Sequence, residues 1–296
     1  MAKPILIFIA SLFLSGIIQA QTPRTYAECK RQPRFVAALT SFDATHSAFS
    51  TSERTVKGLV LIENQGTPKA RIWQHQTWNV AGWLGPITLD KIGNVYTAPA
   101  PLVNVLDNPT KEQNTIWRVN DSTGVLQPFM TLPTGQALDT IDQNPYGILA
   151  MIYDCDQEGL YVSSVAGSTR KVERGRIFYV DLTTKTLKIV VDNIDAMGIC
   201  LSNATGEKRL YFGSARTGEV FSVAYNALLQ KPRLEFSLDG LGVRGDDKPR
   251  RLRINPQGDI MVNGMEFNFN LQAPTEKIET IYRFHFNGKT WVLLRG

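Results

Sequence analysis

The sequence contains few of the residues that build thiol or metal chemistry. It has only three cysteines and three histidines in 296 residues. The cysteines form no CxxC pair and the histidines have no HxH or HxxxH spacing, which disfavours a zinc site. The odd count leaves the disulfide pairing among Cys29, Cys155 and Cys200 open. Cys200 lies in an apolar run, so it is predicted to be a small buried side chain and not a nucleophile.

A large excess of charge of one sign is also missing. Lys and Arg total 32 and Asp and Glu total 27, which gives a formal net charge of +5. The one basic cluster, around Arg250 and Arg251, is short, so no nucleic-acid partner is predicted. The hydrophobic fraction of 43 % excludes wholesale disorder.

Long hydrophobic runs are confined to the N-terminus. Lys3 precedes the apolar run Ile5–Leu14, and the small residue Ala20 closes the segment. This order is typical of a secretory signal peptide, here residues 1–20. The run is shorter than the roughly 20 residues that span a bilayer, which disfavours the alternative of an uncleaved anchor. We therefore expect a secreted or periplasmic protein with no membrane contact after cleavage.

Helical periodicity is almost absent from residues 21–296. Short β-branched and aromatic runs alternate instead with Gly, Asn, Asp and Thr, which indicates an all-β fold. A paired run followed by a further hairpin recurs about every 55 residues. Paired runs lie at 85–96, 146–162, 197–212 and 251–262, further hairpins at 115–126, 176–191, 219–223 and 280–294, and an earlier unit at 58–73.

Four short strands per repeated unit predict a β-propeller of four-stranded antiparallel blades, formed as one domain by residues 21–296. Stacking such sheets radially buries both apolar faces of each sheet. Five blades are visible in the sequence. Closing the ring would bring the N-terminal segment to the last unit, so we expect Arg34–Leu39 to lie near the C-terminal blade.

Three segments carry characteristic turn and strand phrases: Asn144–Ile148, Gly175–Asp181 and Met197–Ser202. They resemble the phrases that mark successive blades in the six-bladed propellers of the gluconolactonase/SMP-30, strictosidine-synthase-like and NHL-type superfamily. The resemblance covers about residues 80–294 and concerns the fold, because these phrases carry strand and turn information. It implies six blades, which we slightly favour over the five visible units.

The lactonase branch of that superfamily implies a divalent metal at the mouth of the central channel, held by Glu, Asn and Asp side chains just before the inner strands. Hard oxygen ligands of this kind suit Ca²⁺. The matching positions here are Leu84, Tyr146, Met197 and Arg250, none of which is a carboxylate or an amide. We therefore predict no metal and no cofactor. A register shift of two residues would bring in Asn144 or Asp195 and make a cation such as Ca²⁺ possible.

Residues just before the inner strands line the channel mouth in such folds. The predicted ligand-binding residues are Trp83, Asn144, Tyr146, Asp195, Met197, Arg250 and Arg251. Strand alternation predicts Arg251 and Arg253 on one face and Arg250 on the other. The planar guanidinium of Arg250 could then hold a carboxylate, sulfate or phosphate. The alternative is a solvated loop paired with Asp246 and Asp247.

Three of the five tryptophans, Trp73, Trp78 and Trp83, lie within eleven residues of each other. Tryptophan faces stack on sugars and flat ligands, but packing between blades is the favoured alternative. Two further groups suggest catalysis: Asp43, His46 and Ser47 or Ser50 as a triad, and the pair Asp139 and Asp142 as acid and base. No GxSxG elbow accompanies the first group, and a capped loop explains the second.

Together these features predict an exported, monomeric β-propeller that binds a small or extended ligand, such as a small molecule or a carbohydrate, at its channel mouth without catalysis. One alternative is a lactonase or ester hydrolase with a shifted site around Asn144 and Asp195. Another alternative is a protein-interaction scaffold.

Overall fold

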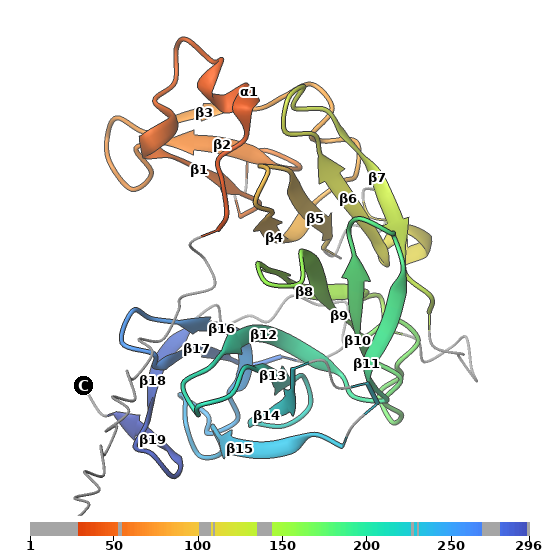
Figure 1. The fold of residues 1–296 in the computed structure, drawn as a ribbon, viewed down its shortest axis with the longest axis vertical. Coiled ribbons are helices and arrows are strands. Elements are labelled where there is room, and N and C mark those ends of the chain that lie inside the picture. The colour runs from red at the N-terminus through yellow and green to blue at the C-terminus, as the bar shows by residue number, and fades with distance from the viewer. Residues whose placement is uncertain are drawn as a thin grey trace, which may run out of the picture.

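The computed structural model describes residues 29–52, 55–100, 108, 110–134, 144–225, 228–229, 231–267 and 279–294. Nearly all regular structure in these ranges is antiparallel sheet, and the sheets are arranged as a β-propeller (Figure 1). The predicted all-β propeller is therefore confirmed. Helical segments are short: α1 (Arg34–Ala37), η1 (Ala44–His46) and η2 (Thr110–Glu112). In this part of the chain no helix has the length and apolarity that crossing a membrane requires. The predicted signal peptide lies outside the described residues.

Five sheets follow one another along the described part of the chain, and we number them blades 1 to 5. Blade 1 has three strands: β1 (Ser47–Ser50), β2 (Val60–Glu63) and β3 (Arg71–Trp73). Blade 2 has four: β4 (Leu84–Leu89), β5 (Val95–Pro99), β6 (Thr115–Val119) and β7 (Leu126–Thr131). Blade 3 comprises β8 (Ile148–Asp154), β9 (Gly159–Ser164), β10 (Arg176–Asp181) and β11 (Leu187–Asp192). Blade 4 comprises β12 (Ala196–Ser202), β13 (Arg209–Ser214), β14 (Glu219–Ala224) and β15 (Arg233–Ser237), and blade 5 comprises β16 (Lys248–Ile254), β17 (Ile260–Met265), β18 (Thr280–Phe286) and β19 (Trp291–Leu294).

The first strand of each four-stranded blade is its inner strand. Consecutive inner strands contact one another in the order β4, β8, β12 and β16 (Figure 1). The remaining strands of each blade follow outward in chain order. Tight hairpins allow this meander, and their turns contain glycines with a left-handed backbone, such as Gly124 (φ 70°) and Gly258 (φ 85°).

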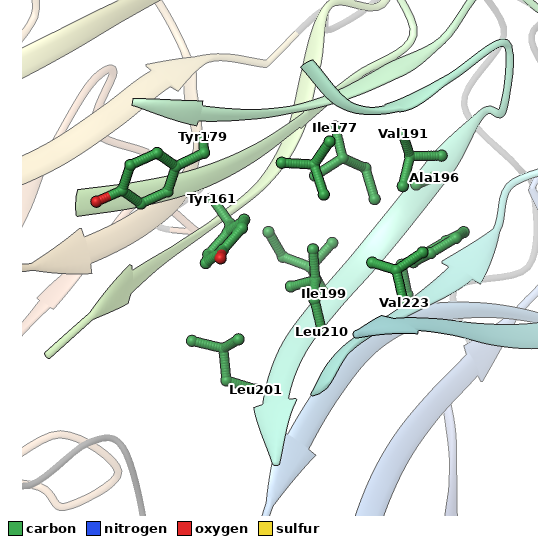
Figure 2. Close-up of a cluster of buried hydrophobic side chains, with 11 residues drawn as sticks. Tyr161, Ile177, Tyr179, Val191, Ala196, Ile199, Leu201, Leu210 and Val223 are labelled. Carbon is green, nitrogen blue, oxygen red and sulfur yellow. The ribbon is translucent and has the colours of Figure 1, made fainter. Parts of the chain in front are cut away.

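Buried apolar side chains join the blades in pairs. One cluster packs Tyr161 and Ile177 of blade 3 against Leu210 and Val223 of blade 4 (Figure 2). Equivalent clusters join blades 1 and 2, blades 2 and 3, and blades 4 and 5. Each interface removes the apolar faces of two sheets from water, which is the main source of stability in a propeller.

Closure of the ring differs from the expectation. The hydrophobic clusters of the described residues join the blades in chain order, and none of these clusters connects blade 5 to blade 1. The five blades match the five units visible in the sequence. The sixth blade that the family resemblance favoured is not found among the described residues.

The N-terminal segment lies elsewhere than predicted. Arg34–Leu39 does not lie beside the C-terminal blade: α1 packs against blades 1 and 2. The Phe35 ring centroid lies 5.9 Å from that of Trp78 and 6.3 Å from that of Phe49. The N–H of Arg34 also donates to the Asp121 carboxylate at 2.8 Å. The prediction was wrong because it derived the position from ring closure, whereas the aromatic cluster of blade 1 supplies the apolar partners for Phe35.

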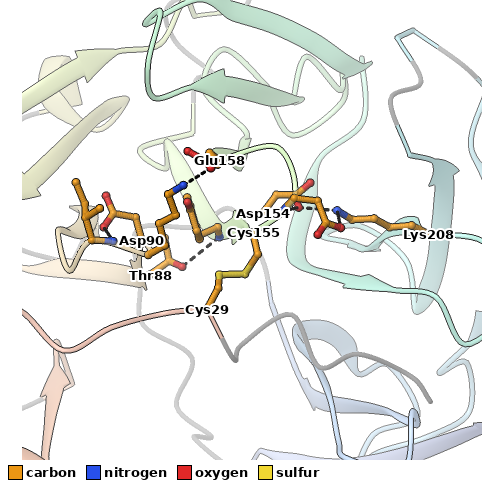
Figure 3. The surroundings of a disulfide bond; sticks show 11 residues. Cys29, Thr88, Asp90, Asp154, Cys155, Glu158 and Lys208 are labelled. Atoms are coloured by element: carbon orange, nitrogen blue, oxygen red, sulfur yellow. Dashed lines mark hydrogen bonds and ion pairs between the residues drawn. A yellow bond between two sulfur atoms is a disulfide. The ribbon is translucent and has the colours of Figure 1, made fainter. Parts of the chain in front are cut away.

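One disulfide ties the start of the described chain to blade 3. Cys29 is bonded to Cys155, directly after β8, with Cα atoms 6.0 Å apart and a sequence separation of 126 (Figure 3). Cys200 is buried, as predicted, and it is the free thiol; burial raises its pKa. Charged pairs lie around the bridge, including Lys208 with Asp154 at 2.5 Å and Lys91 with Glu158 (Figure 3).

Candidate functional site

The predicted ligand-binding residues lie at, or just before, the start of inner strands. We call this end of the propeller the mouth end. The pairing of each inner strand shifts register near its start, for example between Ala196 and Ile199 in β12 and between Pro249 and Arg251 in β16. Similar shifts occur in β4 and β8. Such bulges bend a strand and redirect its side chains, so simple alternation fails here.

Asp195 immediately precedes β12, and its side chain is fully buried. Its carboxylate accepts hydrogen bonds from the Ser168 hydroxyl, from the Gly175 N–H at 3.0 Å and from Arg216 Nε at 2.7 Å. Burial raises the pKa of this carboxyl, while the bond from Ser168 and the charge of Arg216 oppose that shift. Arg216 also donates to the Thr169 carbonyl at 2.6 Å. Asp195 therefore organises the loop between β9 and β10.

Asn144 has a similar internal role before β8. Its Nδ2 donates to the carbonyls of Val165 at 3.0 Å and Ser168 at 2.7 Å. Its Oδ1 accepts the N–H of Tyr146 at 2.8 Å. The amide is buried, so these bonds satisfy it and fix the backbone that leads to Tyr146.

Met197 and Trp83 are also held by their surroundings. Met197 is buried in the bulge of β12. A Cβ on the following residue, Gly198, would lie 2.9 Å from the carbonyl oxygen of Arg250, so the inner strands of blades 4 and 5 approach closely at this point. Trp83 is half-buried, and its backbone N–H and carbonyl bond the side chain of Asn108 at 3.0 and 2.8 Å.

Tyr146, Phe267 and Arg250 are partly exposed residues at the mouth end. The rings of Tyr146 and Phe267 lie 5.3 Å apart between centroids. Burial raises the pKa of Tyr146, and the positive charge of Arg250 lowers it. Arg250 Nη1 donates to Glu279 at 2.7 Å and to the Met265 sulfur at 3.0 Å. The Arg250 side chain is still 41 % exposed.

The arginines of β16 are arranged differently from the alternation prediction, which placed Arg250 opposite Arg251 and Arg253. Arg250 binds Oε1 of Glu279, Asn263 binds Oε2 of the same carboxylate at 2.9 Å, and Arg253 binds Asn263 at 3.0 Å. Asn263 is the cross-strand partner of Arg251. The bulge inserts one residue between Pro249 and Arg251, and this brings the three arginines to one face.

The like charges on this face have an electrostatic consequence. Burial lowers the pKa of Arg250, and the charge of Arg251 adds to that effect, while Glu279 opposes it. Arg251 is exposed beside it. One carboxylate therefore faces two neighbouring guanidinium groups, and an added anion would be electrostatically favoured here.

Of the two predicted catalytic groups, one makes local hydrogen bonds and the other lies outside the described residues. His46 Nδ1 lies 2.6 Å from the Asp43 carboxylate, but the Ser47 hydroxyl donates to the Asp43 carbonyl, and Ser50 pairs with Ser52. Neither Ser47 nor Ser50 is therefore hydrogen-bonded to His46, and the predicted triad is not formed. Asp139 and Asp142 lie outside the described residues. In the part of the chain that is described, no three His, Cys, Asp or Glu side chains gather in a group that could hold a metal ion.

The tryptophan cluster confirms the packing alternative for two of its members. Trp73 and Trp78 meet edge to face with ring centroids 5.0 Å apart, in the core between blades 1 and 2. Trp78 is fully buried, and its indole N–H donates to the Gly124 carbonyl at 2.7 Å. Trp83 lies at the mouth end, outside this core cluster.

Sequence reasoning missed Phe267, Met265 and Glu279, which complete the surroundings of Arg250 and Tyr146. Met265 ends β17, Phe267 follows this strand and Glu279 precedes β18, and the sequence of this region suggested only strands. No local pattern marked these three residues, but in Tyr282–Phe286 aromatic residues alternate with Arg283 and His285. That alternation indicates a strand with one solvated face.

Comparison with known proteins supports the fold. No protein-family model matches this sequence, and no curated protein is detectably similar to it. Among solved structures, a nidogen/laminin complex matches with a TM-score of 0.50 and 12 % identity, covering 81 % of this chain and 75 % of that chain. A Bacteroides uniformis protein with a provisional assignment as a 6-phosphogluconolactonase matches with a TM-score of 0.45 and 12 % identity, covering 84 % and 81 %. At such identity the similarity to the nidogen/laminin structure extends to the propeller fold and no further.

Proposed function

We propose that this β-propeller is a binding protein that holds a small anionic ligand with a flat or apolar body at its mouth end. The observation that carries this proposal is the grouping of Arg250, Tyr146 and Phe267. A partly exposed guanidinium beside an aromatic pair offers a planar donor for an oxyanion and apolar faces for the rest of the ligand. Arg251 adds a second positive charge on the same face.

The hydrolase alternative has weaker support. It needs Asn144 and Asp195 to act on a substrate, yet both side chains are buried and bonded within the chain. A general acid or base must reach a proton of the substrate. We therefore propose binding without catalysis.

The binding proposal can be tested with benzoate and phenyl phosphate, using benzamide as a neutral probe of the same shape. Titrations followed by ligand-observed NMR should show that both anions bind and that benzamide binds far more weakly. Arg250→Met should abolish the difference, and Arg250→Lys should keep part of it, because lysine retains the charge without the planar donor pair.

The matched control is Lys91→Met, which removes the cation paired with Glu158, two residues after the end of β4 that lies away from the mouth end. Anion binding should persist in this variant. Equal binding of benzamide and benzoate to the wild type, or unchanged anion binding in Arg250→Met, would refute the proposal.

We further propose that the protein is exported. The support is the signal-like segment at residues 1–20 and the Cys29–Cys155 disulfide, which suits an oxidising compartment. Mass spectrometry of the exported fraction should find a mature N-terminus at Gln21. A full-length chain retained in the cytoplasm with reduced Cys29 and Cys155 would contradict export.

A further inference from the structure

Blade 5 has one packed face and one solvated face. Leu252, Val262 and Phe284 lie on the packed face, within the cluster shared with blade 4. The opposite face follows from the strand register: Arg251 pairs with Asn263 and then Ile281, and Arg253 pairs with Met261, Arg283 and Leu294. We call this second surface the free face. Its residues are Arg250, Arg251, Arg253, Met261, Asn263, Ile281, Arg283, His285, Val292 and Leu294.

The free face is basic. Its four arginines and His285 are accompanied by the carboxylates of Glu279 and Asp259, each already engaged. Asp259 is fully buried and accepts from Arg283 at 2.6 Å and from His285 at 2.7 Å. Glu279 accepts from Arg250 and Asn263. Arg251 and Arg253 are both exposed.

The free face also exposes apolar side chains between these charges. Ile281 is 61 % exposed, Val292 42 % and Leu294 40 %. Ile281 lies in the same cross-strand row as Arg251, and Leu294 lies in the row of Arg253 and Arg283. Arginine and exposed aliphatic side chains in one patch are typical of protein interfaces, whose centres are apolar and enriched in arginine.

We propose that the free face of blade 5 docks an acidic segment of a partner protein, in which carboxylates alternate with apolar residues. The charge of the face selects an acidic partner. The apolar side chains favour a polypeptide over a nucleic acid. Nucleic-acid binding depends mainly on phosphate charges, which make no use of aliphatic side chains. Four strands present a surface of roughly 14 Å by 20 Å, which matches an extended segment of about six or seven residues.

This interaction goes beyond the proposed function, since it takes a different class of ligand on a larger surface, which shares Arg250 and Arg251 with the mouth-end site and adds Arg253, Ile281, Val292 and Leu294. The test uses the mature, disulfide-bonded chain and a fluorescent peptide of alternating Glu and Leu, with fluorescence anisotropy as the readout. A Lys/Leu peptide tests the sign of charge, a Glu/Gly peptide tests the apolar contribution, and a 12-nucleotide single-stranded DNA tests a general polyanion site.

We expect the Glu/Leu peptide to bind more tightly than the other three probes. Its affinity should fall as the salt concentration rises. Arg253→Glu and Ile281→Asp should each reduce binding by at least about tenfold, because each places a carboxylate against those of the peptide. Lys91→Glu, a charge reversal away from this face, should leave it unchanged. Thermal unfolding and benzoate binding should be normal in Ile281→Asp, which separates this proposal from that for the mouth end.

Two results would overturn the proposal. The first is equal binding of the Lys/Leu or Glu/Gly peptide, or tighter binding of the DNA. The second is unchanged Glu/Leu binding in Arg253→Glu and Ile281→Asp variants that unfold at the wild-type temperature.

Discussion

Blades 4 and 5 have the same strand order, but they differ in what covers their faces. In β12 every residue from Ala196 to Ser202 is buried, and the strand reads as a nearly continuous apolar run. In β16 apolar Leu252 and Ile254 alternate with exposed Arg251 and Arg253. A strand covered on both faces selects apolar residues throughout, whereas a strand covered on one face alternates. One face of blade 5 is therefore exposed to water or to a binding partner.

The largest expected difference is in the free energy of unfolding when one side chain is truncated on blade 4 and one on blade 5. Phe212 of blade 4 is fully buried and stacks on Phe221 with ring centroids 5.8 Å apart. Phe212→Ala should lower the free energy of unfolding by about 3–5 kcal/mol, because it removes apolar burial and leaves a cavity. Ile281→Ala on the free face should change it by less than about 0.5 kcal/mol. Denaturant unfolding of both variants measures the contrast, and similar losses would mean that Ile281 is packed.

The second prediction concerns the disulfide, which ties the N-terminal segment to blade 3. Replacing Cys29 and Cys155 together by serine should cost about 2–4 kcal/mol, since the bond restricts a long loop of the unfolded chain. Unfolding of the oxidised wild type and the double variant gives the value. Cys200→Ser provides a control for the loss of a thiol, and adding reductant to the double variant should have no further effect.

The smallest expected effect is on the stability of the protein in acid, through Asp259 beside the free face. Hydrogen bonds from His285, Asn255 and Arg283 lower the pKa of Asp259 against the raising effect of burial. Because the folded-state pKa lies below the unfolded value of about 3.9, Asp259 stabilises the fold fully above that pH and loses this contribution as the pH falls further. Asp259→Asn should therefore flatten the decline in unfolding free energy below about pH 4. An identical acid decline in wild type and variant would contradict the role of this carboxylate.

The repeat and its inner strands could be predicted from the sequence. The four-strand units between residues 58 and 294 follow from alternating strand and turn residues. Inner strands were expected at Tyr146, Met197 and Arg250, and β8, β12 and β16 lie at these positions. The buried state of Cys200 follows from its apolar neighbours. These features depend on local pattern, which a single sequence records well.

Three features could not be predicted in this way. An odd cysteine count does not determine that Cys29 pairs with Cys155. The bulge that brings Arg250 to the face of Arg251 lies where β16 approaches Gly198 of the preceding blade, and local sequence pattern does not record such a tertiary contact. The solvated face of blade 5 was overlooked for a different reason: repeat reasoning treats all blades as equally covered, although the alternation in Lys248–Ile254 indicates otherwise.

Site-specific thiol labelling tests the central claim most directly, that blade 5 has a solvated face and blade 4 does not. Ile281→Cys and Val220→Cys, the latter at a fully buried position of β14, would be labelled with a maleimide in the native, disulfide-bonded protein. We expect the cysteine at 281 to react as fast as a free thiol, and the cysteine at 220 and native Cys200 to react only on unfolding. Protection at position 281 equal to that at position 220 would contradict it.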